Sequence, residues 1–368
     1  MRRWRSIPVT VVLAFVGVPA QAQFKPGNVL VSEPSQEICS RPGYPDRIWQ
    51  VDPYTADVTL VVELTGDDCG YVTGLAVTPD GCGLRASSLL NDRILEFKAD
   101  GTWTVVLDAK DGILSPWGSN GVAYDREGNF YVVNAGSRNI MRFPSGGGAG
   151  IVVADELDGV QGKGPLTIAP NGDIYYGNQR NDKYVLRIPP AGEASIFDDY
   201  GRLDLPFGIA TDSRALLYVS LANAGLAEFV LGDPDSRRIV ATREAMQGAD
   251  ALSFAADHTR LFAGSGFPRG LLEIALDDFE VRLLAEIPGG SNIGVGIAVV
   301  PVTTGDLNRD GQVDPLDWAV WTPCLSGPGS PAPHESCGLA DVDGDWDLDL
   351  KDFAAFQQTF GARTQSCK

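Results

Sequence analysis

The stretch GVAYDREGNFYVVN, residues 121–134, decides the fold because close variants of it recur along most of the chain. It contains a run of small and β-branched residues, a polar turn with Gly and Asn, and a second strand-forming run. Related segments begin at residues 74, 121, 165, 208, 251 and 296, which are 43 to 47 residues apart. Self-similarity at such a period predicts an architecture of repeated supersecondary units.

Each unit continues with a third run, such as RILEF at residues 93–97, and a fourth, such as WTVVLD at residues 103–108. Four short antiparallel strands in about 44 residues are typical of one propeller blade. Residues 27–73 provide only the second to fourth strands of a blade, whereas residues 296–301 provide only a first strand. We therefore predict an all-β, six-bladed β-propeller whose C-terminal strand completes the N-terminal blade and leaves no open sheet edge. A β-sandwich is the alternative, but its strands do not repeat at this period.

The repeat resembles the NHL-repeat and gluconolactonase (regucalcin)-like six-bladed propellers over roughly residues 27–302. This resemblance implies a fold more than an activity, because such rings carry many functions. Residues just before the inner strands should gather at one axial mouth, where they would suit a divalent cation or a sugar. These residues are Asn120, Lys163, Asp204, Asp250 and Asn292.

The likeness to lactonases makes Asn120 a candidate metal ligand and Asp250 a candidate ligand or base. Alternatively, Asn and Asp at such positions satisfy backbone groups of the turns that precede the strands. The two histidines of the chain do not form a convincing serine-hydrolase triad. Two functions stay open: a binding or scaffold module with a carbohydrate or small-molecule ligand at its axis, and a metal-dependent lactonase- or esterase-type hydrolase.

A different motif, GDLNRDGQVDPLDWAVW, follows at residues 305–321. Its oxygen-bearing residues occupy positions 1, 3, 5, 7, 9 and 12 of a calcium loop, and Gly311 allows the sharp turn at position 6. The first loop starts at Asp306, and a second copy starts 35 residues later at Asp341. An aromatic helix should follow each loop. We predict Ca²⁺ as the cofactor of a small α-helical domain that is loose without it. The candidate ligands are Asp306, Asn308, Asp310, Gln312, Asp314, Asp317, Asp341, Asp343, Asp345, Asp347, Asp349 and Asp352.

The tandem resembles a type I dockerin, with EF-hand-type loops, over residues 305–361. This implies a cohesin-like or cell-surface protein partner and a place in a polysaccharide-degrading assembly. The chain departs from the pattern at Trp346, which replaces the glycine of the second loop, and in a Gly/Pro-rich insert between the repeats. Pro315-Leu316 and Leu350-Lys351 replace the polar pairs that recognise cohesin. These departures affect partner recognition more than calcium binding.

The N-terminus has the features of a secretory signal peptide: basic residues, an apolar run and Ala20-Gln21-Ala22. We expect cleavage near Ala22, export of the chain, a propeller over residues 23–303 and the dockerin-like domain over residues 304–368. Export permits disulfides, and we predict the pairs Cys324–Cys337 and Cys39–Cys69, with Cys82 and Cys367 unassigned. A net charge of −19 argues against nucleic acid and anionic membranes as partners. No later segment is apolar enough to span a membrane, and we expect a monomer.

Overall fold

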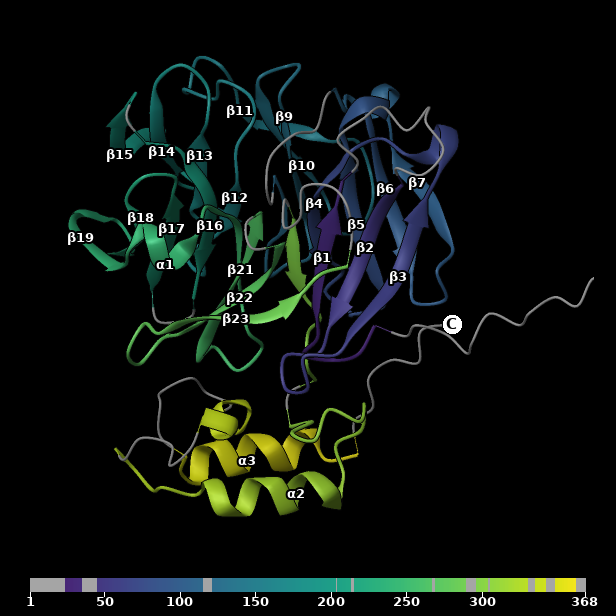
Figure 1. Cartoon of the computed structure of the whole chain (residues 1–368), viewed down its shortest axis with the longest axis vertical. Helices are drawn as coiled ribbons and strands as arrows, with labels where there is room; N and C mark the ends of the chain where they lie inside the picture. Colours follow the sequence, from purple (N-terminus) through teal and green to yellow (C-terminus); the bar gives the residue numbers. More distant parts are fainter. Residues whose placement is uncertain are drawn as a thin grey trace, which may run out of the picture.

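The computed structural model describes residues 24–34, 45–114, 121–202, 204–212, 215–266, 269–288, 296–303, 305–329, 335–341 and 348–361. They form six four-stranded antiparallel sheets around a common axis, with a small helical unit below (Figure 1). The six-bladed propeller is confirmed, and a β-sandwich is excluded. The predicted signal peptide lies outside the described residues. No helix among the described residues is long and apolar enough to cross a membrane.

Each blade consists of four strands that follow one another from the axis outward. The first three blades are β24 (Ile297–Val299), β1 (Val29–Glu33), β2 (Asp46–Val51), β3 (Val58–Leu64); β4 (Val72–Val77), β5 (Gly83–Ser88), β6 (Arg93–Lys98), β7 (Trp103–Leu107); and β8 (Val122–Tyr124), β9 (Phe130–Asn134), β10 (Asn139–Phe143), β11 (Ile151–Ala154). The other three are β12 (Leu166–Ile168), β13 (Ile174–Asn178), β14 (Lys183–Ile188), β15 (Ser195–Gly201); β16 (Pro206–Thr211), β17 (Leu216–Leu221), β18 (Gly225–Val230), β19 (Asp233–Ala241); and β20 (Ala249–Phe254), β21 (Arg260–Gly266), β22 (Arg269–Ala275), β23 (Val281–Glu286).

The ring closes in the first blade, where the first and last strands of the propeller pair as the sequence predicted. Strand β24 pairs antiparallel with β1, and Val29, Leu30 and Val31 lie opposite Val299, Ala298 and Ile297. Backbone hydrogen bonds from Gly27 to Val300 and from Ser32 to Gly296 extend the pairing at both ends. The ring is therefore closed at this seam by the hydrogen bonds between β24 and β1.

Glycine before an inner strand lets neighbouring blades approach closely. A β-carbon on Gly296 would lie 2.1 Å from the carbonyl oxygen of Thr73 in the next blade. One on Gly208 would lie 2.8 Å from the backbone nitrogen of Leu252. The repeated glycine is thus a packing requirement of the axis, and larger residues there would push two blades apart.

The helical unit below the ring is built on α2 (Pro315–Trp321) and α3 (Leu350–Thr359). Two short 3₁₀ segments lie between them, η4 (Thr322–Cys324) and η5 (Glu335–Ala340). The two helices lie side by side in Figure 1, and their aromatic side chains pack together, with Trp318 and Trp321 each 5.2 Å from Phe353 between ring centroids. A Cys324–Cys337 disulfide joins the two 3₁₀ segments.

Candidate functional site

The inner strands give the ring two different axial ends. We call the end where they begin, marked by Lys163 and Asp250, the upper mouth. We call the opposite end, where β24 leaves the ring toward the helical unit, the lower face (Figure 1). Of the five predicted axis residues, Lys163, Asp204 and Asp250 are described, whereas Asn120 and Asn292 lie outside the described residues.

Lys163 and Asp250 come from different blades and influence each other electrostatically across the upper mouth. Burial raises the pKa of Asp250 to about 6, and the nearby positive charge of Lys163 opposes that rise. Burial lowers the pKa of Lys163, and the like charges of Lys183 and Arg180 lower it further. A carboxyl group that titrates near neutral pH beside a lysine is suited to general acid–base chemistry.

Asp204 has a structural role that the alternative interpretation anticipated. One carboxylate oxygen accepts hydrogen bonds from the backbone nitrogens of Leu205 (2.9 Å) and Asn223 (2.8 Å), and the other accepts one from Ala224 (3.0 Å). The carboxylate thus joins the start of β16 to the loop after β17. Asp204 therefore stabilises the rim of the mouth. Lys163 and Asp250 remain the described pair that is suited to acid–base chemistry.

Below the mouth, a belt of branched aliphatic side chains surrounds the axis. Each inner strand contributes one member, and all six are 2–3% exposed: Leu75, Val122, Leu166, Ile209, Leu252 and Ile297. The residue after each belt member is small, and the difference in size leaves a cavity of about 370 Å³ toward the lower face. The belt therefore lies between this cavity and the upper mouth along every inner strand.

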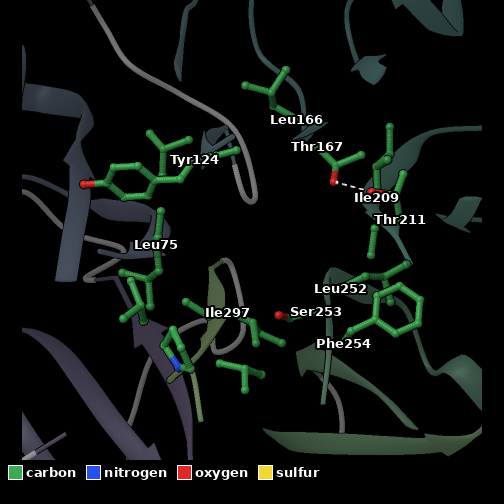
Figure 2. A pocket seen from close by; sticks show the side chains of 18 of the residues that line it. Leu75, Tyr124, Leu166, Thr167, Ile209, Thr211, Leu252, Ser253, Phe254 and Ile297 are labelled. Atoms are coloured by element: carbon green, nitrogen blue, oxygen red, sulfur yellow. Dashed lines mark hydrogen bonds between the residues drawn. The ribbon is translucent and has the colours of Figure 1, made fainter. Parts of the chain in front are cut away.

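Figure 2 shows this cavity with side chains of all six inner strands around an open centre. The hydroxyl groups of Thr167 and Thr211 lie 3.4 Å apart on one side, and Ser253 turns its hydroxyl toward the centre. Among the described residues that line the cavity, the ionisable side chains are Tyr124 and His258. Without a carboxylate or lysine in that described lining, the cavity suits a small, largely apolar ligand better than it suits hydrolysis.

The first predicted calcium loop has the local geometry that its spacing demands. The two carboxylate oxygens of Asp306 accept from the backbone nitrogens of Asp310 (3.1 Å) and Gly311 (2.9 Å), which turns the chain around the first position. Asn308 accepts from the same nitrogen of Asp310 and donates to its carboxylate. These hydrogen bonds thus join the side chain of position 1 to the backbone of positions 5 and 6, and the side chain of position 3 to both the backbone and the carboxylate of position 5.

The twelfth position of this loop is also buried. Asp317 accepts from the backbone nitrogens of Leu307 (2.7 Å) and Asn308 (3.0 Å) with one oxygen, and from Asp314 (2.7 Å) with the other. Both Asp306 and Asp317 are 0% exposed. Burial raises the pKa of Asp306 to about 6, and the negative charges of Asp317 and Asp310 act in the same direction.

The rest of the predicted ligand set is placed less completely. Asp314 and Asp349 start α2 and α3 as N-caps, each accepting from the backbone nitrogen two residues later. Gln312 is exposed, Asp341 is partly buried, and Asp352 is 0% exposed. Asp343, Asp345 and Asp347 lie outside the described residues. Within the described residues, no three His, Cys, Asp or Glu side chains converge closely enough to form a metal cluster.

The cysteine predictions have different outcomes. The Cys324–Cys337 bond is present, with sulfur atoms 2.08 Å apart. Cys69 is disulfide-bonded too, but its predicted partner Cys39 lies outside the described residues. Cys82, which the sequence left unassigned, is also disulfide-bonded, and Cys367 is outside the described residues.

Sequence reasoning missed a set of residues between the ring and the first loop. Arg309, at position 4 of the loop, contacts Tyr54 in the turn between β2 and β3. Position 4 carries no calcium ligand, so the ligand pattern gave no reason to select it. The one available sign was an arginine inside an otherwise acidic loop.

Comparisons with known proteins identify the fold and no family. No family model matches the sequence, and no curated protein sequence matches it. A propeller chain from a nidogen–laminin complex is 15% identical with a TM-score of 0.60, covering 74% of this chain and 98% of that one. A gluconolactonase from Xanthomonas campestris is 21% identical with a TM-score of 0.50, covering 71% of this chain and 88% of that one. At these identities, both likenesses concern the architecture alone.

Proposed function

We propose that this chain is an exported, calcium-binding propeller protein whose helical unit docks it to a protein partner or surface. The observation that carries the proposal is the burial of Asp306 and Asp317, both 0% exposed. Among the described residues, neither has a lysine or arginine within ion-pair distance. Buried carboxylates that lie together are unfavourable until a cation neutralises them, and Ca²⁺ is the cation that prefers oxygen ligands at this spacing.

The first loop fits the ion in chemistry as well as in burial. The side chains of Asp306, Asn308, Asp310 and Asp317 and the backbone carbonyl of Gln312 would hold it. The bound ion would supply the positive charge that this buried cluster lacks. The second loop, which starts at Asp341, would bind more weakly because Trp346 replaces its glycine.

Calorimetric titration of the full chain with CaCl₂ tests this proposal, with MgCl₂ as the comparison ion. We expect calcium to bind and to change the fluorescence of the stacked Trp318 and Trp321. Asp317→Asn should weaken binding to the first loop by about 100-fold or more, because a carboxylate ligand is lost. Absence of heat together with unchanged fluorescence would contradict calcium binding.

Docking through the helical unit has its own support. Leu316 is 61% exposed and Leu350 is 78% exposed, and each lies at the start of the helix that follows a loop. Two exposed apolar side chains in the first turns of the two helices suit a protein partner that covers them. Capture by cohesin modules in calcium, lost in the Leu316→Asp/Leu350→Asp variant, would support this role. Capture would also support a place in a polysaccharide-degrading assembly.

A metal-dependent lactonase-like hydrolase at the upper mouth is the second candidate. The observation that favours it is Asp250, whose pKa of about 6 and position opposite Lys163 suit a general base. The expected result is turnover of sugar lactones by the full chain, reduced about 100-fold in Asp250→Asn. The exposed Asp235→Asn is the control. If the full chain hydrolyses no lactone with calcium, zinc or manganese present, the ring is a binding module.

A further inference from the structure

The first calcium loop touches the propeller through the side chain of Arg309. Its guanidinium carbon lies 3.8 Å from the centroid of the Tyr54 ring, and its Nη2 lies 3.8 Å from a carboxylate oxygen of Asp52. The side chain of Arg309 is only 19% exposed. An arginine over an aromatic ring and beside a carboxylate is stabilised by a cation–π interaction and an ion pair at the same time.

The surface that receives Arg309 is fixed by the ring itself. Asp52 accepts hydrogen bonds from the backbone nitrogens of Tyr54 (2.9 Å) and Thr55 (3.4 Å), which hold the turn closed. On the ring side, the guanidinium of Arg260 lies 4.9 Å from the Tyr54 centroid. The Tyr54 hydroxyl donates to Asp257, which is paired with Arg260 at 2.8 Å. Tyr54 is therefore positioned by the neighbouring blade, formed by β20 to β23, before the loop reaches it.

On the loop side, the position of Arg309 depends on the calcium ligands beside it. Its neighbours in sequence, Asn308 and Asp310, occupy positions 3 and 5 of the loop. Its own φ of +59° lies in the left-handed region, which arginine rarely adopts. The turn formed by Asp306 with the nitrogens of Asp310 and Gly311 holds the backbone there. An unfolded loop would not present Arg309 to the ring.

Beside the Arg309 contact, the interface between the ring and the helical unit contains a gap. A cavity of about 470 Å³ lies between them, lined on the ring side by Lys25, Asp80 and Pro301 and on the loop side by Asp310 and Gly311. An interface with such a gap depends on the few contacts that bridge it. The Arg309 side chain, which reaches both Tyr54 and Asp52, is the clearest of these contacts.

We infer that the lower face of the propeller is a built-in partner for the first calcium loop, so that ion binding and seating of the helical unit reinforce each other. The inference rests on the proposed calcium function. The ring holds Arg309 in the conformation that the occupied loop requires, and the ordered loop presents Arg309 to the ring. Because such coupling is reciprocal, the loss of Tyr54 must weaken calcium binding at a site to which Tyr54 contributes no ligand.

Calcium titration of the full-length Tyr54→Ala variant is the test. We expect affinity at the first loop to fall about fivefold, as for the loss of one partly exposed cation–π contact. Arg309→Gln should produce the same fall, because it keeps a polar side chain and removes the guanidinium group with its charge. The matched control is Arg238→Gln, which removes a similar contact 5.2 Å from the Phe279 centroid on the outer part of the ring. This control should leave calcium affinity unchanged.

Hydrogen exchange of the full chain supplies a readout on the propeller side. Calcium should slow exchange in the Asp52–Asp57 turn of the wild type and have no effect there in Arg309→Gln. If both variants bind calcium as tightly as the wild type, the coupling is wrong and the calcium proposal stands. If the wild type binds no calcium, the proposed function fails and the coupling fails with it. A misfolded Tyr54→Ala protein would show a lowered unfolding temperature. In that case, the calcium affinity of Arg309→Gln decides whether the coupling exists.

Discussion

The carboxylate cluster around Arg260 in the ring and the buried carboxylates of the first loop have opposite surroundings. In the ring, Glu273 is 4% exposed and is paired with Arg260 at 3.1 Å and with Arg282 at 2.6 Å. In the first loop, Asp306 and Asp317 are 0% exposed and accept only backbone N–H groups among the described residues. The ring therefore provides the positive charge for Glu273 itself, whereas under the proposed function the first loop takes its positive charge from Ca²⁺. The comparison predicts that the stability of the helical unit depends on calcium more than the stability of the ring does.

Removing calcium should separate the two halves most strongly. At a free calcium concentration about 1,000 times Kd, each occupied loop gains about 4 kcal/mol, and a chelator removes this gain. We expect the near-ultraviolet circular dichroism of the stacked tryptophans to collapse in EDTA. The unfolding temperature of the ring should move by only a few degrees. Equal loss of stability in both halves would break the comparison.

Removing the ring's own positive charge should be the next largest effect. Arg260→Met leaves Asp257 and Glu273 buried without their shared partner, which typically costs about 3–5 kcal/mol. The control is Arg238→Met, whose exposed pair with Glu228 should contribute less than about 1 kcal/mol. Urea unfolding of the ring measures both variants. Similar midpoints for the two would show that the ring does not depend on this internal neutralisation.

The Cys324–Cys337 disulfide stabilises the helical unit without an ion. It closes a loop with a sequence separation of 13, and a loop of this size contributes about 3 kcal/mol. Cys324→Ser/Cys337→Ser should therefore weaken calcium binding and leave the ring transition unchanged. Substitution is preferred to reduction because Cys69 and Cys82 of the ring are also bonded. Unaltered calcium affinity would show that the unit is already folded without the bond.

Asp250 is a buried ring carboxylate whose protonation should also affect stability. Its folded-state pKa of about 6 exceeds the ordinary value of 3.8, so the native state keeps its proton to higher pH than the unfolded chain does. Stability should therefore fall by about 3 kcal/mol as pH rises through the window between those two values. Asp250→Asn should lack this slope, and the exposed control Asp235→Asn should retain it. Urea midpoints across this range measure the difference.

The fold was predictable because its signal is repeated along the chain. Small or branched residues recur at each inner strand, with a leading glycine and a following polar turn in most repeats, and the missing first strand at residues 27–73 had its complement at residues 296–301. The closure of β24 on β1 follows from that count of strands. The local turn around Asp306 was equally predictable, since each ligand position has a fixed separation from the next.

Contacts between repeats were not predictable from the sequence. Tyr54 and Asp257 are separated by 203 residues and belong to no shared motif, yet their hydrogen bond helps to position the surface that receives Arg309. The same limitation applies at the upper mouth. Asp204 precedes β16 and Asp250 lies near the start of β20, and both were expected at the mouth, but the first is turned to three backbone nitrogens and the second interacts with the charge of Lys163. Only the local backbone conformation distinguishes a carboxylate that caps backbone nitrogens from one whose pKa is raised by burial.

The position of β24 has a mechanical consequence. Only six residues, from 300 to 305, separate the end of this strand from Asp306, so tension on a docked helical unit is transmitted to the strand that closes the ring. The antiparallel pairing with β1 would resist such a load mainly in shear, which requires several hydrogen bonds to break together. The Arg309 contact offers a parallel route, because it carries part of the load to the turn after β2 in the same blade. A tethered molecule would thus resist a pulling force at the connection between β24 and the helical unit.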